Sequence, residues 1–138
     1  MPEEQTKASN FSISELARML EVSPSTIRFY EDKGLILPKR TAGNQRIYSS
    51  RDKARMKLIL RGKRFGFSLT EIAEMIGMAD SPMSEQAQIE KSLKYIAGKF
   101  SELSQRKKEL VILEQDLQVI REKLQRRARE LKAEQKKT

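Results

Sequence analysis

The sequence predicts a mainly α-helical fold with one small β-hairpin, followed by a long C-terminal helix. Three observations predict it. A Ser followed three residues later by Glu or Asp, the capping box that starts a helix, occurs at Ser12, Ser49 and Ser68. A segment with Pro and Gly separates the second expected helix from the third. Apolar residues then recur at every seventh position from Ile89 to Leu131.

The first two expected helices form a helix-turn-helix. After the Ser12 cap, apolar residues at 13, 16, 17 and 20 follow the spacing i, i+3, i+4, i+7 of an amphipathic helix. Ser23 and Pro24 suit the cap and first position of a second helix, which we expect to end at Gly34. On this pattern alone a generic helical hairpin in a small core is the preferred interpretation. The distribution of charge described below reverses that preference.

The segment 35–48 is predicted to be a β-hairpin. It places Pro38, Gly43 and Asn44 between two short flanks that carry apolar residues, which is typical of two strands joined by a flexible turn. The turn is also rich in Lys and Arg. A cationic hairpin that follows a helix-turn-helix is a wing.

Two further helices complete the expected domain. The first begins at the Ser49 cap and carries a basic stripe at spacing i, i+4, i+8, i+11, formed by Lys53, Lys57, Arg61 and Arg64. A solvated helix face usually mixes both signs of charge, so we interpret this stripe as a line of phosphate contacts. The second begins at Ser68, buries apolar residues at 69, 72, 73 and 76, and is expected to stop at Gly77.

The excess positive charge lies in one segment. The 138 residues carry a net charge of +9, and the stretch from Arg28 to Arg64 contains twelve Lys or Arg against three Asp or Glu. Such a surface favours an anionic partner, nucleic acid or acidic membrane. The membrane hypothesis would use "RRARELKAEQKK", but that segment lacks an apolar face with aromatic residues, so it is the least favoured.

Several classes of function are excluded by composition. The chain has no Cys and no His, so thiolate or imidazole metal sites, disulfides, iron–sulfur clusters and catalysis by Cys or His are ruled out. We expect no enzymatic activity, no cofactor and no bound metal. The chain also has no apolar run long enough to span a membrane and no signal-peptide pattern at its start, so we expect no membrane partner and a cytoplasmic location, associated with the bacterial nucleoid.

The heptad pattern predicts a coiled coil. Leu93 and Phe100 fill the companion positions early, whereas Leu113 and Ile120 fill a flanking line later, which indicates a stammer or a change of partner surface. A lone helix cannot bury its own seam, so we prefer a homodimer over packing within one chain. The residues expected at the dimer interface are Ile89, Leu93, Ile96, Phe100, Leu103, Leu110, Leu113, Leu117, Ile120 and Leu124.

These patterns together predict five parts of the chain. They are a disordered N-terminus (1–10), a winged helix-turn-helix domain that binds DNA (11–80), a linker (81–88), a coiled-coil dimerisation helix (89–131) and a basic tail (132–138).

Three stretches of this sequence, "TIRFYEDKGLI", "LPKRTAGNQRIYSSRD" and "GFSLTEI", together resemble the MerR family of bacterial transcription regulators. The match runs from about Phe11 to Met78. The resemblance implies a sequence-specific transcriptional regulator that dimerises through an antiparallel coiled coil, binds an inverted-repeat operator in double-stranded DNA and distorts the promoter. It also implies RNA polymerase as a partner at the promoter.

The resemblance implies DNA contacts from Arg28 and Tyr30 on the second helix, from Arg40 and Arg46 on the wing, and from the Tyr48 hydroxyl near a phosphate. For both tyrosines, packing in the core is an equally weighted alternative. Three further residues near the start and exposed side of the second helix are candidate readers of DNA. The full set of expected DNA contacts is Ser25, Thr26, Arg28, Tyr30, Lys33, Arg40, Arg46, Tyr48, Lys53, Lys57, Arg61 and Arg64.

Within the family, the stretch "RIYSSRDKARMKLILRGKRFGFSL" resembles regulators of branched-chain amino-acid and fatty-acid breakdown. That resemblance implies a small-molecule effector of the acyl-CoA type. Its expected site lies around residues 78–89, although a plain linker there is the preferred interpretation. The alternative function for the whole chain is an architectural or excisionase-like protein that bends DNA without an effector; the long coiled coil favours the regulator, because fixed half-site spacing needs a rigid spacer.

Overall fold

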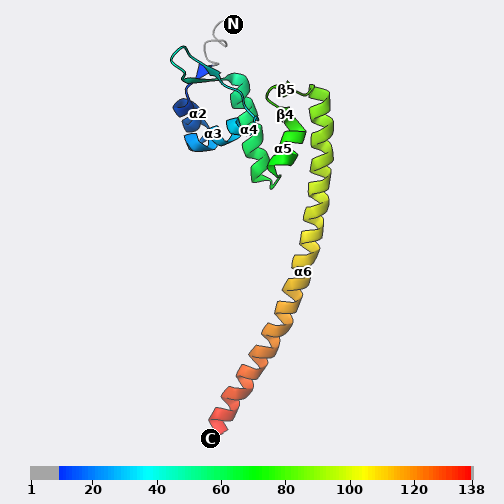
Figure 1. Ribbon diagram of the computed structural model, residues 1–138. Helices are drawn as coiled ribbons and strands as arrows, with labels where there is room; N and C mark the ends of the chain where they lie inside the picture. The colour runs from blue at the N-terminus through cyan, green and yellow to red at the C-terminus, as the bar shows by residue number, and fades with distance from the viewer. Residues whose placement is uncertain (1–9, 138) are drawn as a thin grey trace, which may run out of the picture. The chain divides into compact units, whose positions relative to one another are not determined.

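The computed structural model, which describes residues 10–137, contains the predicted helix-turn-helix (Figure 1). Helix α2 spans Ile13–Leu20 and helix α3 spans Pro24–Asp32. Both bonds of the Ser12 capping box are formed, and the Ser23 hydroxyl accepts from the Thr26 amide at 3.2 Å. The second helix ends at Asp32, two residues before the predicted stop, and Gly34 supplies a left-handed turn with φ +76°.

The wing is a three-stranded sheet, although the sequence predicts only two of its strands. Strands β2 (Lys39–Arg40) and β3 (Arg46–Ser49) form the predicted hairpin, and β1 (Asn10–Phe11) pairs with the other edge of β3. All pairs are antiparallel, with Phe11 opposite Tyr48. Asn10 therefore belongs to the sheet and not to a disordered terminus; the rest of that predicted segment, residues 1–9, lies outside the described residues.

Helices α4 (Ser50–Arg64) and α5 (Leu69–Ile76) pack against each other and complete the core of this domain. Both predicted capping boxes are formed, and Gly77 ends α5 with φ +76°. Gly62 allows close packing, because a Cβ there would lie 3.0 Å from Ile72 Cγ1. The largest fully buried side chains are those of Leu16, Ile27, Leu35, Ile36, Tyr48, Met56, Ile59 and Ile72.

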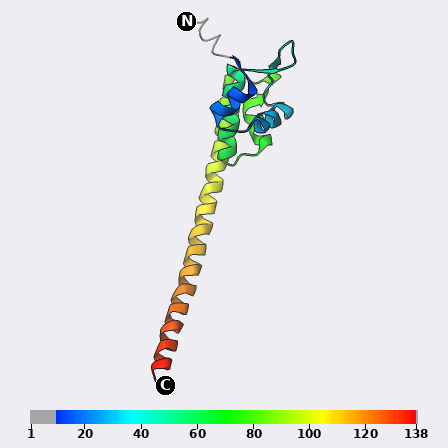
Figure 2. The same cartoon turned by 90° about the vertical axis from the view of Figure 1, so that its left-hand side faces the viewer.

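The predicted linker 81–88 is wrong in most of its length. Strands β4 (Gly77–Met78) and β5 (Ser81–Pro82) form a short hairpin, and helix α6 spans Glu85–Lys137. The Ser84 hydroxyl accepts from the Ala87 amide at 3.1 Å, so this residue caps the helix. The predicted coiled-coil segment and most of the predicted basic tail are thus parts of one continuous helix, which Figure 2 shows without a break.

The described part of the chain divides into two units, with the boundary between Tyr95 and Ile96. The first turns of α6 belong to the N-terminal unit, where the Tyr95 ring packs edge-on against Phe67 with ring centroids 6.4 Å apart. In the other unit, every described residue is exposed or half-buried. Side chains of the heptad seam such as Leu103 and Leu117 are 42% and 59% exposed, so a single chain does not bury the predicted seam.

Candidate nucleic-acid interface

Helix α3, which we call the recognition helix, presents one polar face to solvent. Ile27 and Tyr30 are buried in the core, and this places Arg28 and Phe29 on the outside. The Lys33 ammonium lies 5.4 Å from the centre of the Phe29 ring, a cation–π contact. The exposed face therefore combines two cations with an aromatic ring, which suits the edges and phosphates of a DNA groove.

The residues near the start of α3 that were predicted to contact DNA differ in their exposure and in their hydrogen bonds. Ser25 is exposed and accepts a long hydrogen bond of 3.5 Å from Arg28 Nη2. Thr26 is half-buried, and its hydroxyl lies 3.0 Å from the Ser23 hydroxyl within the helix cap. Thr26 thus has a structural role in the cap, whereas Ser25 and Arg28 remain on the surface.

The wing carries Arg40 and Arg46 on neighbouring strands, at directly opposite positions. Its tip is a tight turn, in which the Thr41 amide donates to the Gln45 carbonyl at 2.8 Å and Asn44 adopts a left-handed φ of 62°. Arg40 also donates to the Asn44 carbonyl at 3.2 Å. This arrangement gives the wing tip a defined shape.

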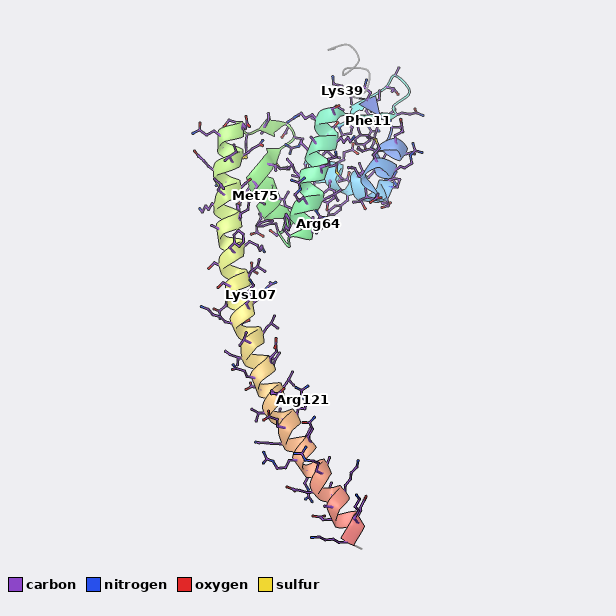
Figure 3. The ribbon with its side chains drawn as sticks, turned by 180° about the vertical axis from the view of Figure 1, so that it is seen from behind. Phe11, Lys39, Arg64, Met75, Lys107 and Arg121 are labelled. Carbon is purple, nitrogen blue, oxygen red and sulfur yellow. The ribbon has the colours of Figure 1, made fainter. Side chains whose placement is uncertain are left out.

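The basic stripe of α4 is formed as predicted on one face of the helix. Lys57, Arg61 and Arg64 are exposed, while Lys53 is half-buried with its ammonium 5.3 Å from the Phe11 ring centre. Figure 3 shows that the stripe extends away from the wing, because Phe11 and Lys39 lie near one end of α4 and Arg64 lies at the other. The four cations therefore form a line that can follow a phosphate backbone, and not a single pocket.

The two tyrosines belong to the core, so the structure does not support the contacts that the resemblance implies for them. Tyr30 is 6% exposed and Tyr48 is fully buried. Burial raises the pKa of both phenols. The pKa of Tyr48 rises to about 12, and the negative charge of Glu31 adds a smaller contribution there. The Tyr48 hydroxyl has no hydrogen-bond partner among residues 10–137, so its ring acts by packing.

Three charged residues that organise the site were missed by the sequence analysis. Glu31 accepts from Arg46 Nε at 2.6 Å and lies 3.6 Å from Arg40, so it joins the recognition helix to the wing. Asp52 is buried, where its carboxylate accepts from the Leu37 amide at 3.3 Å as well as closing the α4 cap. The signal for Asp52 was its place in a capping box, but nothing local identifies its second partner.

Arg55 is the third of these residues and is 6% exposed. Its guanidinium donates to the Leu35 carbonyl at 2.6 Å, the Ile76 carbonyl at 3.2 Å and the Gly77 carbonyl at 2.6 Å. Burial lowers the pKa of Arg55 from its ordinary value, although an Arg in a protein stays charged. It therefore ties the chain that follows the recognition helix to the end of α5 and the start of β4.

Among residues 10–137, no helix has the length and apolar character of a membrane span. The described part of the chain also contains no group of three or more His, Cys, Asp or Glu placed to hold a metal ion. The candidate site is thus a surface built from a helix, a three-stranded wing and a basic stripe. These elements define a DNA-binding protein of the winged helix-turn-helix class.

Comparison with known proteins identifies the family. Residues 11–78 match the MerR HTH family regulatory protein domain, and residues 53–120 match the MerR DNA-binding domain. The HTH-type transcriptional regulator ZntR of Escherichia coli is 34% identical over 109 residues, covering 78% of this chain and 76% of the relative. The mercuric resistance operon regulatory protein of Pseudomonas fluorescens is 35% identical over 103 residues, covering 72% of each chain.

A solved structure agrees with this assignment. The crystal structure of a MerR family transcriptional regulator from Bacillus cereus superposes with a TM-score of 0.59 and 26% identity, covering 75% of this chain and 74% of that chain. The present chain belongs to the MerR family, and it is a DNA-binding transcriptional regulator. The predicted family and winged helix-turn-helix fold class are thereby confirmed.

Proposed function

We propose that the chain binds an inverted-repeat operator as a homodimer and distorts the DNA between the two half-sites. The observation that carries this proposal is the exposed apolar seam of α6. Its side chains recur every seven residues and are 42% to 65% exposed in the single chain between Ile96 and Leu124, apart from Phe100 at 69%. A second copy that packs on this seam would bury it and would bring two winged domains to one DNA site.

The proposed roles follow from geometry at each position. Arg28 and Lys33 read or anchor DNA from the recognition helix, and Arg46 and Arg40 do so from the wing. The α4 stripe fixes the domain on the duplex through phosphates, because Lys and Arg bind phosphate regardless of sequence. The dimer would use an antiparallel coiled coil formed by the predicted interface residues.

The effector and RNA polymerase are further parts of this proposal. One relative is named for mercuric resistance, but these 138 residues contain no Cys or His to provide thiolate or imidazole ligands. On the resemblance to regulators of branched-chain amino-acid and fatty-acid breakdown, we propose a small organic effector of the acyl-CoA type, and we also propose action on RNA polymerase at the promoter from a cytoplasmic location. Transcription from the recovered operator, with and without acyl-CoA compounds, tests both partners.

Genome-wide capture of bound DNA tests the main proposal. Recovery of a few promoter sites that contain an inverted repeat is expected. Recovery of many sites without a shared sequence would instead support the architectural function, in which the protein bends DNA and senses nothing. Recovery of no DNA above background would contradict both.

A further inference from the structure

The cross-strand pair of the wing creates an electrostatic problem. Arg40 and Arg46 are directly opposite each other on β2 and β3, and like charges at such positions destabilise a sheet. Both side chains are only partly exposed, 41% for Arg40 and 27% for Arg46. Their mutual repulsion would tend to move the wing strands apart or to swing the side chains into different rotamers.

Glu31 resolves this repulsion from the neighbouring element. One carboxylate oxygen, Oε2, accepts from Arg46 Nε at 2.6 Å, and the other, Oε1, lies 3.6 Å from Arg40 Nη2. The Glu31 side chain is 15% exposed, so this pair is better shielded from solvent and salt than a surface ion pair. The hydrogen bond to Glu31 raises the pKa of Arg46.

The position of Glu31 is unexpected on charge alone. It lies on the recognition helix, where a carboxylate near DNA would repel phosphate, and it lies within the most basic segment of the chain. The bond uses Nε of Arg46, and among residues 10–137 its two terminal amino groups have no hydrogen-bond partner. Glu31 can therefore hold the guanidinium in place while leaving two donors for DNA.

We propose that Glu31 is a positioning residue for DNA recognition, which fixes the two wing arginines relative to the recognition helix so that wing and helix read the DNA as one unit. The inference rests on the proposed contacts of Arg40 and Arg46 with DNA. It assigns to a residue of the helix the control of specificity at bases contacted by the wing. Glu31 itself would not need to touch DNA.

The test compares Glu31→Gln with Asp32→Asn in the full chain. Both changes remove one negative charge from the recognition helix, but Asp32 is exposed and forms no hydrogen bond or ion pair with the wing within the described residues. Affinity is measured for the captured operator and for a scrambled duplex of equal length, over a series of salt concentrations. Circular dichroism and thermal unfolding of each variant, without DNA, show that the fold is kept.

We expect Glu31→Gln to lose about tenfold in operator affinity, the size of one well-placed Arg contact, and to change little on scrambled DNA. Its salt slope on the operator should stay close to that of the unaltered protein, because the lost contact is one that carries sequence information and the phosphate contacts are kept. Asp32→Asn should tighten binding to both DNAs and keep the slope. Glu31→Asp, which keeps the charge with a shorter reach, should recover part of the operator affinity.

If Glu31→Gln instead behaves like Asp32→Asn, tightening binding to both DNAs, Glu31 is only a repulsive charge and the inference is overturned. Equal losses on operator and scrambled DNA, with a lower unfolding temperature, would show a purely structural role and would also overturn it. Failure of the proposed function is distinguishable, because then the unaltered protein itself would not prefer the operator over scrambled DNA.

Discussion

Tyr48 shows how a single residue can fit a family pattern and still have a different role from the one implied. It lies two residues after Arg46 in the wing motif, on the same face of β3, but unlike Arg46 it is fully buried. Alternation along the strand "RIYS" was visible in the sequence, but how far each residue is covered depends on α2 and α4, which are remote in sequence. Sequence alone therefore left packing and DNA contact equally weighted.

Replacing Tyr48 with Phe should leave operator affinity unchanged within about twofold, since the buried hydroxyl has no role at the surface. It should also remove a component of alkaline instability. Burial raises the phenol pKa from 10.0 to about 12, so the folded state keeps a proton that the unfolded state loses above pH 10. This stabilisation is present below pH 10 and is lost as pH rises towards 12, with a slope of at most about 1.4 kcal/mol per pH unit.

Urea unfolding of both proteins between pH 9 and 12 measures that difference; the pH range is set by the raised pKa of Tyr48. The unfolding free energy of the unaltered protein should fall faster than that of Tyr48→Phe across the range. Parallel curves, or a loss of operator affinity of tenfold or more in the variant, would place the hydroxyl in contact with solvent or DNA and contradict its burial.

Arg55 is expected to matter for stability and not for direct DNA contact. Arg55→Met fills a similar volume but leaves three carbonyls without their donor. Each unsatisfied buried polar group costs about 1–3 kcal/mol, so we expect the free energy of unfolding to fall by about 3 kcal/mol or more.

Arg51→Met is the matched control. Arg51 is exposed and has one long hydrogen bond of 3.3 Å to the Ala79 carbonyl, so its loss should cost less than about 1 kcal/mol. Chemical denaturation compares the two, and equal losses would refute the assigned role.

The elements of the DNA-binding domain differ in how far the sequence determines them. Helix starts were predicted correctly because a capping box is complete within four residues, as at Ser12, Ser49 and Ser68. The strand β1 was missed because its partner β3 is more than thirty residues away, and two residues carry no strand pattern of their own. The β4–β5 hairpin was missed for the same reason, and its second strand was assigned to the linker, since the position of the hairpin depends on Arg55 and on the bond from the Ala79 amide to the Gly34 carbonyl.

The start of α6 could have been placed better from sequence. Ser84 is followed by residues with good helix propensity, and its hydroxyl caps the helix, but the apolar heptad begins only at Ile89. The end at Lys137 was missed because a charged helix without apolar residues has the same composition as a basic tail. For α6, the sequence analysis was correct that a long helix is present and wrong about the residues at which it starts and ends.

The α4 stripe leads to a prediction for an entire element. Lys57→Ala should weaken binding to operator and scrambled DNA alike and lower the salt slope by about one, because a phosphate contact carries no sequence information. Lys63→Ala is the control, since Lys63 is exposed on a different face of the same helix. Binding titrations of both variants on both duplexes test this prediction. An equal effect of the two variants would mean that binding depends on total charge and not on the position of the charge on the helix.

For the whole molecule, the homodimer is the feature on which operator recognition depends. Leu117→Lys places a charge in the exposed seam and should raise the dimer dissociation constant by tenfold or more, about the effect of one buried Leu. Gln115→Lys adds the same charge two residues away, off the seam, and should leave the dimer intact. Sedimentation equilibrium measures both, and a monomer–dimer equilibrium unaffected by Leu117→Lys would contradict the proposed seam.

The spacing of the two half-sites provides the last prediction. Helix α6 is uninterrupted over its 53 residues, so a dimer built on it should hold the recognition helices at a fixed separation. One base pair inserted at the operator centre moves the half-sites apart by about 3.4 Å and rotates them by about 34–36°. The DNA must then bend or untwist to fit, and the free-energy cost of this distortion falls on base pairs that the protein does not touch.

We expect this insertion to lower affinity more than a change at most contacted bases and to abolish regulation. Flexible pyrimidine–purine steps at the centre should be tolerated better than stiff tracts. Affinity and promoter output measured across a series of centre lengths test this, and flat curves would show that the two domains move independently.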